Sequence, residues 1–87
     1  MLFIFDKANR YGFWMKDMLV PIDIFWLGSD MRVVSFIRDV ATSTYPHVFY
    51  PARPALYVLE TAAGFTEQNS VTTGTLLRLQ NFKLVSN

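Results

Sequence analysis

The sequence contains no cysteine and a single histidine, His47, among its 87 residues. Without thiols the chain can form no disulfide, no thiolate zinc site and no cysteine nucleophile. A lone imidazole has no second histidine with which to hold a metal ion, so we predict no metal site and no cofactor. The lack of cysteine does not by itself indicate a cellular compartment.

Clusters of one charge and long apolar runs are also missing. Eight basic and seven acidic residues are mixed along the chain, with a net charge of +1, so no basic stripe of the kind that binds nucleic acid is present. No apolar run approaches the roughly 18 residues that span a bilayer, so we predict no membrane span. No signal peptide is visible, because the apolar start MLFIF leads directly into Asp6 and Lys7 without a small-residue cleavage pattern.

Hydrophobic and aromatic residues are abundant instead, at 52% and 16% of the chain. This length allows one domain, residues 1–87, and a domain of this size buries a little more than about 60% of its unfolded surface. So much apolar material must either form a dense core or leave apolar surface for a partner.

The densest apolar stretch, FWMKDMLVPIDIFWL at residues 13–27, contains both tryptophans. Pro21 divides it, because proline lacks an N–H and fixes its own φ. We predict two strands here, at about 13–16 and 22–27, joined by a bend. Alternate side chains of a strand point to opposite faces, and both faces of the second strand are apolar apart from Asp23. This pattern predicts a central strand that is covered on both sides.

Asp23 is the main polar candidate within this strand. A carboxylate in an apolar strand must be paired or hydrogen-bonded, or its pKa shifts in favour of the neutral form. It can be a structural group that bonds to the backbone or to Lys16, the nearest cation in the sequence. It can also be a site carboxylate at the mouth of a cleft, because groups with shifted pKa values gather at functional sites. The sequence leaves both interpretations open.

Four further segments combine apolar alternation with flanking turn residues, as strands do, at residues 2–5, 32–38, 55–61 and 75–80. The segment at 32–38 forms a predicted antiparallel hairpin with 22–27. A short helix is predicted near residues 63–69, although Gly64 weakens it. We therefore predict a mainly β fold, a compact sandwich-like or barrel-like antiparallel sheet of short strands with one short helix.

The longest irregular stretch, residues 39–54, contains three of the four prolines together with Tyr45 and Tyr50. Long loops in small domains are often functional. These aromatic side chains can strap one end of the sheet, or they can form a lip that faces a ligand. Glu60 is a further candidate, because it stands in an apolar row of the predicted strand at 55–61.

Several motifs occur in order along the chain: MLFIF, FWMK followed after four residues by PIDI, then TYP, YP, and LYVLE followed after three residues by GF. With these motifs, residues 1 to about 79 resemble the domain of unknown function 192 family, also called uncharacterised protein family 0127. The resemblance implies a mainly β fold with short helices. It also implies an extracytoplasmic location, periplasmic or secreted, because many members carry a secretion signal. It implies no particular activity.

The chain departs from the family pattern at two places. Members usually have a further strand and a GLM-x-R segment ahead of MLF, which this sequence lacks. We therefore expect a domain without its upstream strand and helix, whose strand at 2–5 lies inside the sheet beside an uncovered edge through which chains self-associate. Members also usually have asparagine, and often threonine next, where this chain has Asp17 and Met18. A carboxylate only accepts hydrogen bonds, whereas an amide also donates them.

Three functions from different classes fit these observations. A binding module would use an aromatic-lined cleft to hold a small molecule, a sugar or a peptide. A structural or assembly module would bury its spare apolar surface against another chain. A hydrolase or lyase would use Asp23 and Glu60 as a carboxylate pair, but the sequence has no recognisable catalytic motif. We favour the first and lean against an enzyme, with candidate ligand-binding residues Trp14, Lys16, Asp17, Asp23, Tyr45, Tyr50 and Glu60.

Overall fold

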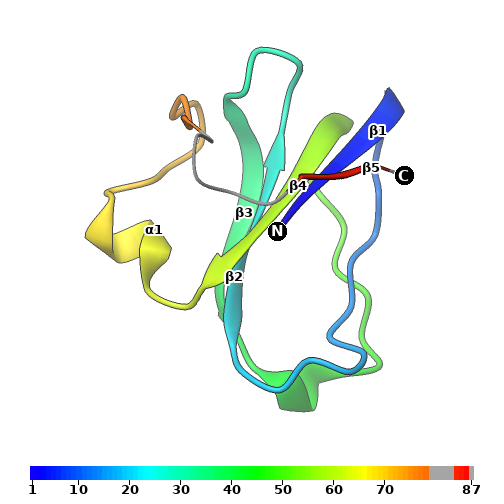
Figure 1. Ribbon diagram of the computed structural model, residues 1–87, viewed down its shortest axis with the longest axis vertical. Helices are drawn as coiled ribbons and strands as arrows, with labels where there is room; N and C mark the ends of the chain where they lie inside the picture. The colour runs from blue at the N-terminus through cyan, green and yellow to red at the C-terminus, as the bar shows by residue number, and fades with distance from the viewer. Residues whose placement is uncertain (79–83, 87) are drawn as a thin grey trace.

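The computed structural model describes residues 1–78 and 84–86 of the chain. Five strands form one sheet in the order β3–β2–β4–β1–β5 (Figure 1). Their bounds are Leu2–Asn9 for β1, Ile22–Leu27 for β2, Val33–Val40 for β3, Ala55–Ala62 for β4 and Leu84–Ser86 for β5. A 3₁₀ turn, η1, spans Thr42–Thr44, and the described helix, α1, spans Phe65–Gln68. The prediction of a mainly β fold with one short helix is confirmed.

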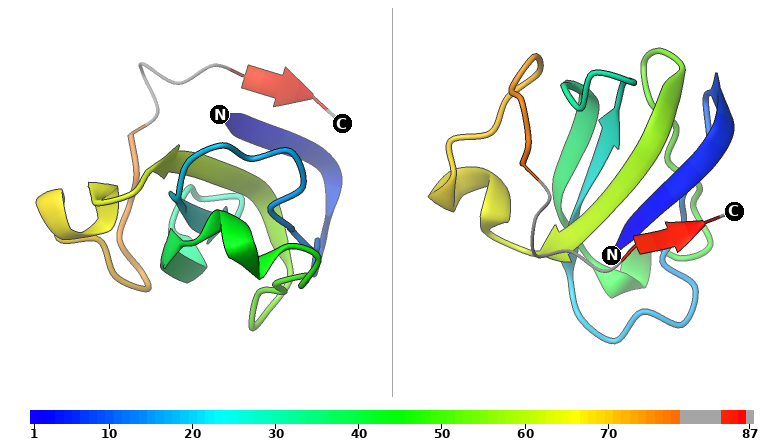
Figure 2. Two further views of the ribbon diagram at one scale, coloured as in Figure 1. Left: turned by 90° about the horizontal axis from the view of Figure 1, so that it is seen from below. Right: turned by 45° about the horizontal axis from the view of Figure 1, so that its top comes forward.

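Strands β1 to β4 pair in antiparallel fashion, with β2 between β3 and β4, and with β1 on the other side of β4. Strand β5 pairs with β1 in parallel. The sheet curves, as the left view of Figure 2 shows, but β3 and β5 remain separate edges, so the described strands do not form a closed barrel. In the described part of the chain, no helix is long and apolar enough to span a membrane.

Strand β2 is the centre of the core, and all six of its residues are buried. Ile22, Ile24 and Trp26 belong to one buried cluster, whereas Phe25 and Leu27 belong to another. The predicted central strand is therefore confirmed, with its hairpin to β3. We call the two sides of the sheet the Trp26 face and the Phe25 face.

Different segments cover the two faces. Side chains from residues 13–18 and from the loop after β3 pack on the Trp26 face: Phe13, Met15, Met18 and Phe49. Side chains from the segment after β4 pack on the Phe25 face: Phe65, Val71 and Leu77. A group on one face is therefore separated from a group on the other by the sheet itself.

The predicted strand at 13–16 is wrong. Only Phe13 forms a bridge, with Phe49, and the chain then turns, with the N–H of Met18 donating to the carbonyl oxygen of Met15 at 3.2 Å. The apolar alternation has another cause here, because Phe13 and Met15 point down onto the Trp26 face. A segment that lies over the face of a sheet can show the same apolar alternation as a strand within the sheet, because both bury every second side chain.

Further differences from the prediction concern the segment at 75–80, the helix and the surroundings of β1. In the segment at 75–80, Leu76 makes a single bridge with Arg32, and residues 79–80 lie outside the described residues. Helix α1 begins only at Phe65, because Gly64 before it has a left-handed φ of 100°. Strand β1 lies inside the sheet, as predicted, and β5 pairs with it along Leu2–Ile4, so β5 is the outer strand on this side of the described sheet.

Candidate functional site

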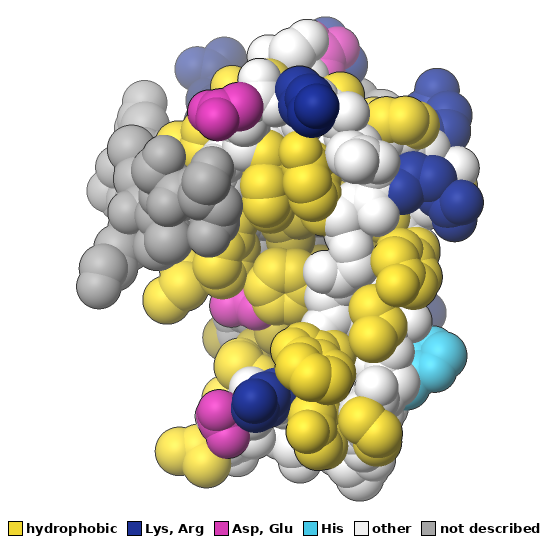
Figure 3. All heavy atoms as spheres, turned by 90° about the vertical axis from the view of Figure 1, so that its right-hand side faces the viewer, with side chains coloured by type: hydrophobic (Ala, Val, Ile, Leu, Met, Phe, Trp, Pro, Cys, Tyr) yellow, Lys and Arg dark blue, Asp and Glu magenta, His cyan; other side chains and the backbone are white. Residues whose placement is uncertain are grey.

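A hollow of about 390 Å³ opens on the Trp26 face, beside β1 and the segment that precedes β2. Two charged side chains, Lys16 and Glu60, line it together with Met1, Phe3, Gly12, Phe13, Trp14 and Met18. We call it the aromatic hollow. Figure 3 shows that hydrophobic side chains reach the surface over much of the side of the molecule seen there, with basic and acidic side chains among them.

Trp14 forms an exposed wall of this hollow. Its side chain is 42% exposed, whereas the other tryptophan, Trp26, is fully buried. The ring centroid of Trp14 lies 5.2 Å from that of Tyr45, and the Nζ atom of Lys16 lies 5.6 Å from the Trp14 centroid. That distance is within the range in which a cation is attracted to an aromatic face. The structure therefore brings three predicted site residues together.

A second hollow, of about 320 Å³, adjoins the first and is lined by Gly12, Trp14, Val48 and Tyr50. We call it the tyrosine hollow. Gly12 and Trp14 line both hollows, so the indole stands between them. A Cβ atom on Gly12 would lie only 2.7 Å from Tyr50 and from Val48, so glycine is what allows the two segments to approach this closely. Tyr50 thus joins the candidate site from the far side of Trp14.

Glu60 comes from β4 and is half-buried where it lines the aromatic hollow. Burial raises the pKa of its carboxyl, and the positive amino group of Met1 opposes that rise. This amino group donates its hydrogen bond to the backbone oxygen of Glu60, at 2.7 Å. Within the described residues, the Glu60 carboxylate has no ion pair or hydrogen bond of its own, and Lys16 does not pair with it. The hollow therefore holds one acidic and one basic side chain that do not bond to each other, and the amino group of Met1 lies beside the acidic one.

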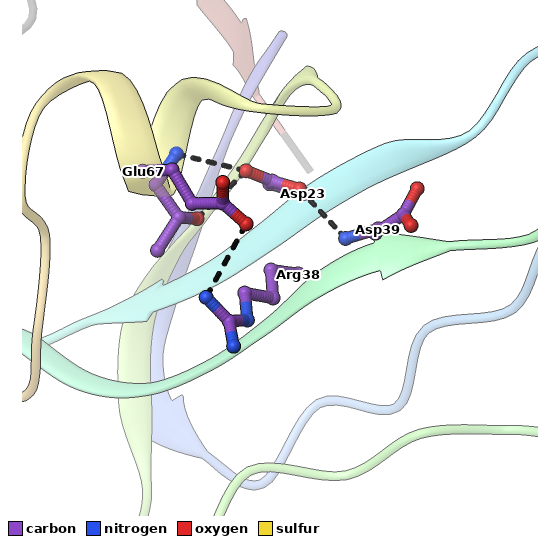
Figure 4. A network of polar contacts seen from close by, with 5 residues as sticks. Asp23, Arg38, Asp39 and Glu67 are labelled. Carbon is purple, nitrogen blue, oxygen red and sulfur yellow. Dashed lines mark hydrogen bonds and ion pairs between the residues drawn. The ribbon is translucent and has the colours of Figure 1, made fainter.

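Asp23 has a different environment, because it is fully buried on the Phe25 face. Its Oδ1 atom accepts the N–H of Asp39 at 2.7 Å, and its Oδ2 atom accepts the N–H and the hydroxyl of Thr66 at 2.9 and 2.7 Å (Figure 4). Burial alone would raise the pKa of Asp23, but these hydrogen bonds favour the charged form and hold the pKa below its usual value. Asp23 therefore ties α1 to β2 and β3, and the backbone-bonded structural interpretation is the one observed.

The strand register separates Asp23 from both of its predicted partners. In the pairing of β2 with β4, Asp23 lies opposite Thr61 and Ile24 lies opposite Glu60. Residues directly opposite each other share a face and successive residues alternate, so the Asp23 and Glu60 side chains point to opposite sides of the sheet. Lys16 belongs to the segment that covers the Trp26 face, so the alternative in which Lys16 pairs with Asp23 is not the one observed.

Asp17 is exposed and lines neither hollow. It occupies the turn between Met15 and Met18 with a left-handed φ of 61°, a conformation that asparagine and aspartate adopt more readily than most residues. Its role is therefore in the backbone of the turn. Among the described residues, no group of three or more His, Cys, Asp or Glu side chains could hold a metal ion.

Six residues that line the two hollows were not among the candidates from the sequence: Met1, Phe3, Gly12, Phe13, Met18 and Val48. Phe3 has the pattern of an ordinary core strand, and nothing in the sequence indicates that β1 brings it beside the segment before β2. Gly12 is the one with a usable signal, because a glycine directly ahead of two aromatic residues indicates a close approach of the chain.

Two solved structures are similar to this chain. A crystal structure of a proposed transcription regulator from Sinorhizobium meliloti has a TM-score of 0.79 and 27% sequence identity, and the match covers 85% of this chain and 57% of that one. A crystal structure of a protein of unknown function from Novosphingobium aromaticivorans has a TM-score of 0.74 and 27% identity, over 85% of this chain and 52% of that one. This chain thus spans little more than half the length of either protein.

Comparison with curated proteins gave no match. The model of the DUF192 family, described as an uncharacterized ACR family, matches residues 1–79. This span includes β1 to β4, α1 and both hollows, and it agrees with the span over which the sequence motifs resemble that family. The chain belongs to the DUF192 family.

Proposed function

We propose that this chain is a binding module for a small ligand and that the aromatic hollow is its binding site. One observation carries the proposal: Glu60 and Lys16 line the same apolar hollow without bonding to each other. Small-ligand sites are typically apolar concavities of roughly 300–1,000 Å³ with a few polar groups that orient the ligand. The aromatic hollow has a volume in that range and this kind of lining.

The tyrosine hollow supports the same proposal, because it offers a ligand room to extend. A ligand that lies against Trp14 can reach Glu60 and Lys16 on one side and Tyr50 on the other. Exposed tryptophan and tyrosine provide flat, rigid contact area with a polar atom at the edge. Of the predicted site residues, this proposal keeps Trp14, Lys16, Tyr45, Tyr50 and Glu60.

Two other functions have less support. A hydrolase or lyase that uses Asp23 with Glu60 requires both carboxyl groups in one pocket, and the register places them on opposite faces. An assembly module is favoured by one specific observation, since Leu19 is 92% exposed and Val20 is 59% exposed. Large exposed apolar side chains that adjoin each other often mark a contact with another chain.

The role proposed for the Sinorhizobium protein does not extend readily to this chain. Eight basic and seven acidic residues are mixed along the sequence, whereas proteins that bind nucleic acid usually concentrate positive charge on one face. An extracytoplasmic location remains a prediction from the family resemblance.

The test is a ligand titration that uses Trp14 as the reporter. Trp14 is partly exposed and Trp26 is fully buried, so a ligand in either hollow changes the emission of Trp14 above a constant background. The probes are phenylalanine, a short peptide with a free amino terminus and a glucose disaccharide, each at millimolar concentration. We expect saturable changes with at least one probe. They disappear in Trp14→Phe and persist in Leu76→Ala, which changes an exposed apolar side chain outside both hollows.

NMR titration of the same samples shows where on the chain each probe binds, and it can therefore contradict the proposal. If none of the probes shifts the amide signals of the residues that line the hollows, the proposal is wrong. If ligand-induced shifts instead gather around Leu19 and Val20, the assembly surface is the functional one.

A further inference from the structure

We propose that the aromatic hollow recognises an α-ammonium group attached to an apolar side chain, and that Glu60 receives the ammonium. This inference rests on the proposed function and adds the chemical class of the ligand. The α-ammonium group is shared by free apolar amino acids and by peptide amino termini, so both are candidate sources of the ligand.

Glu60 supplies the acidic side chain of the aromatic hollow. Its carboxylate is half-buried beside aromatic side chains, and no described residue forms an ion pair or hydrogen bond with it. A carboxylate in such a place loses solvation, and the nearby amino group of Met1 offsets this loss only in part, because it donates its hydrogen bond to the backbone oxygen of Glu60. A ligand cation replaces the lost hydration of the carboxylate with a charge-assisted hydrogen bond. Hydrogen bonds of this type are about twice as strong as neutral ones.

The remaining lining of the aromatic hollow indicates what the rest of the ligand should be. Apart from Glu60 and Lys16, the side chains that line the aromatic hollow are apolar: Met1, Phe3, Phe13, Trp14 and Met18. A sugar would bring many hydroxyl groups against these carbon surfaces, and each buried hydroxyl without a partner costs binding energy. An apolar side chain next to a single ammonium group satisfies both the carbon surfaces and the carboxylate. This comparison favours an amino acid or a peptide over a sugar.

Lys16 is exposed and lies over the face of Trp14. In a free amino acid the carboxylate is bonded to the same carbon as the ammonium, so Lys16 is placed to attract it. In a peptide that carboxylate is an amide, and the chain continues past Trp14 towards the tyrosine hollow. Lys16 therefore distinguishes the two sources, since only the free amino acid gives it an anion to bind.

The experiment compares phenylalaninamide with N-acetylphenylalaninamide by the Trp14 emission and by NMR titration of the 87-residue chain. The two compounds share the aromatic side chain and the amide, and only the first has an ammonium group. We expect acetylation to weaken binding about tenfold or more, as the loss of one charge-assisted hydrogen bond implies. The variant Glu60→Gln should show the same loss for phenylalaninamide, whereas Asp6→Asn, which changes an exposed carboxylate on β1, should leave binding unchanged.

The source of the ammonium follows from two additional measurements. If phenylalanine binds more tightly than its amide and Lys16→Gln removes the difference, the ligand is a free amino acid. If the tripeptide Phe-Gly-Gly binds more tightly than phenylalaninamide and Tyr50→Ala removes the difference, the ligand is a peptide terminus. Either result supports the inference.

Other results overturn it in separable ways. Equal binding of the acetylated and free compounds, or unchanged binding in Glu60→Gln, shows that Glu60 does not receive an ammonium, while the binding module itself stands. Binding of the disaccharide alone has the same meaning. If no probe binds at all, the proposed function fails together with the inference. Should Glu60→Gln not fold, the comparison of acetylated and free compounds on the unmodified chain still decides the question.

Discussion

At the scale of single residues, the two carboxyl groups that stand in apolar strand rows have opposite environments. Asp23 is fully buried and accepts hydrogen bonds from three donors. Glu60 is half-buried and has no such donors among the described residues. The sequence predicts both as unusual, since each interrupts an apolar row. It could not predict which of them is satisfied, because the donors to Asp23 lie 16 and 43 positions away.

Replacement of Asp23 by alanine should destabilise the fold strongly. The change leaves both donors of Thr66 without their acceptor in a buried place, and the N–H of Asp39 without its acceptor in a partly buried one. We expect the free energy of unfolding to fall by roughly 3 kcal/mol or more, from the loss of charge-assisted hydrogen bonds and the unpaired donors that remain. Urea denaturation followed by circular dichroism measures this. Asp6→Ala, at an exposed position, should change stability by less than about 0.5 kcal/mol, and a comparably small effect for Asp23→Ala would refute the structural role.

The shifted pKa values of these two groups make stability depend on pH in opposite directions. The pKa of Asp23 is lowered in the folded chain, so its contribution is present above its unfolded pKa of about 3.9 and is lost as the pH falls through the lowered value. The pKa of Glu60 is raised. Its contribution is therefore present below its unfolded pKa of about 4.3 and is lost as the pH rises through the raised value.

Glu60→Gln should consequently raise the melting temperature at pH 7, because a neutral amide avoids the cost of holding a half-buried charge. The difference should disappear below about pH 4, where the glutamate is itself neutral in both states. Thermal melts across this pH range, with the exposed Glu67→Gln as the control, give the measurement. A lower melting temperature for Glu60→Gln at pH 7 would mean that the charged carboxylate has a stabilising partner.

At the scale of elements, runs of apolar residues bounded by turn residues predict β2, β3 and β4 and the hairpin between the first two, and β2 is apolar on both faces because both faces of the sheet are covered. The same signal fails for residues 13–16, since Phe13 and Met15 lie over the sheet instead of within it. The candidate site shows the same limit. Trp14, Lys16 and Glu60 can be singled out from the sequence. They share a hollow with Phe3 only because β1, at the start of the chain, pairs with β4, which comes much later in the sequence.

The turn between Met15 and Met18 positions Lys16 at the hollow, and its geometry depends on Asp17. The left-handed φ of 61° at Asp17 is costly for most side chains. We expect Asp17→Asn to fold with unchanged stability, and Asp17→Ala to lose about 1 kcal/mol because alanine lacks the local polar contacts that favour this conformation. Chemical denaturation of both variants tests the expectation. Equal stability of the two would show that the turn does not select its residue by backbone conformation.

At the scale of the whole molecule, the described structure leaves one conspicuous apolar surface outside the hollows. Strand β1 is paired with β5 along Leu2–Ile4, so the edge of the described sheet on that side belongs to β5. Leu19 and Val20 remain, with 92% and 59% of their surface exposed, directly before the exposed Pro21. They project from the bend between the covering segment and β2, where no described part of the chain packs over them.

If the chain self-associates, this tip is therefore the place where we expect the contact. The double substitution Leu19→Ser and Val20→Ser should reduce any concentration-dependent association, and it should change the stability of the monomer by less than about 0.5 kcal/mol per site because both side chains are already in water. Sedimentation velocity over a range of concentrations measures the first effect and thermal melts the second. Leu76→Ser removes an exposed apolar side chain elsewhere and should leave association unchanged. Association that persists in the double variant would locate the contact elsewhere, whereas a double variant that stays monomeric and loses the Trp14 response to ligands would make the tip part of the binding site.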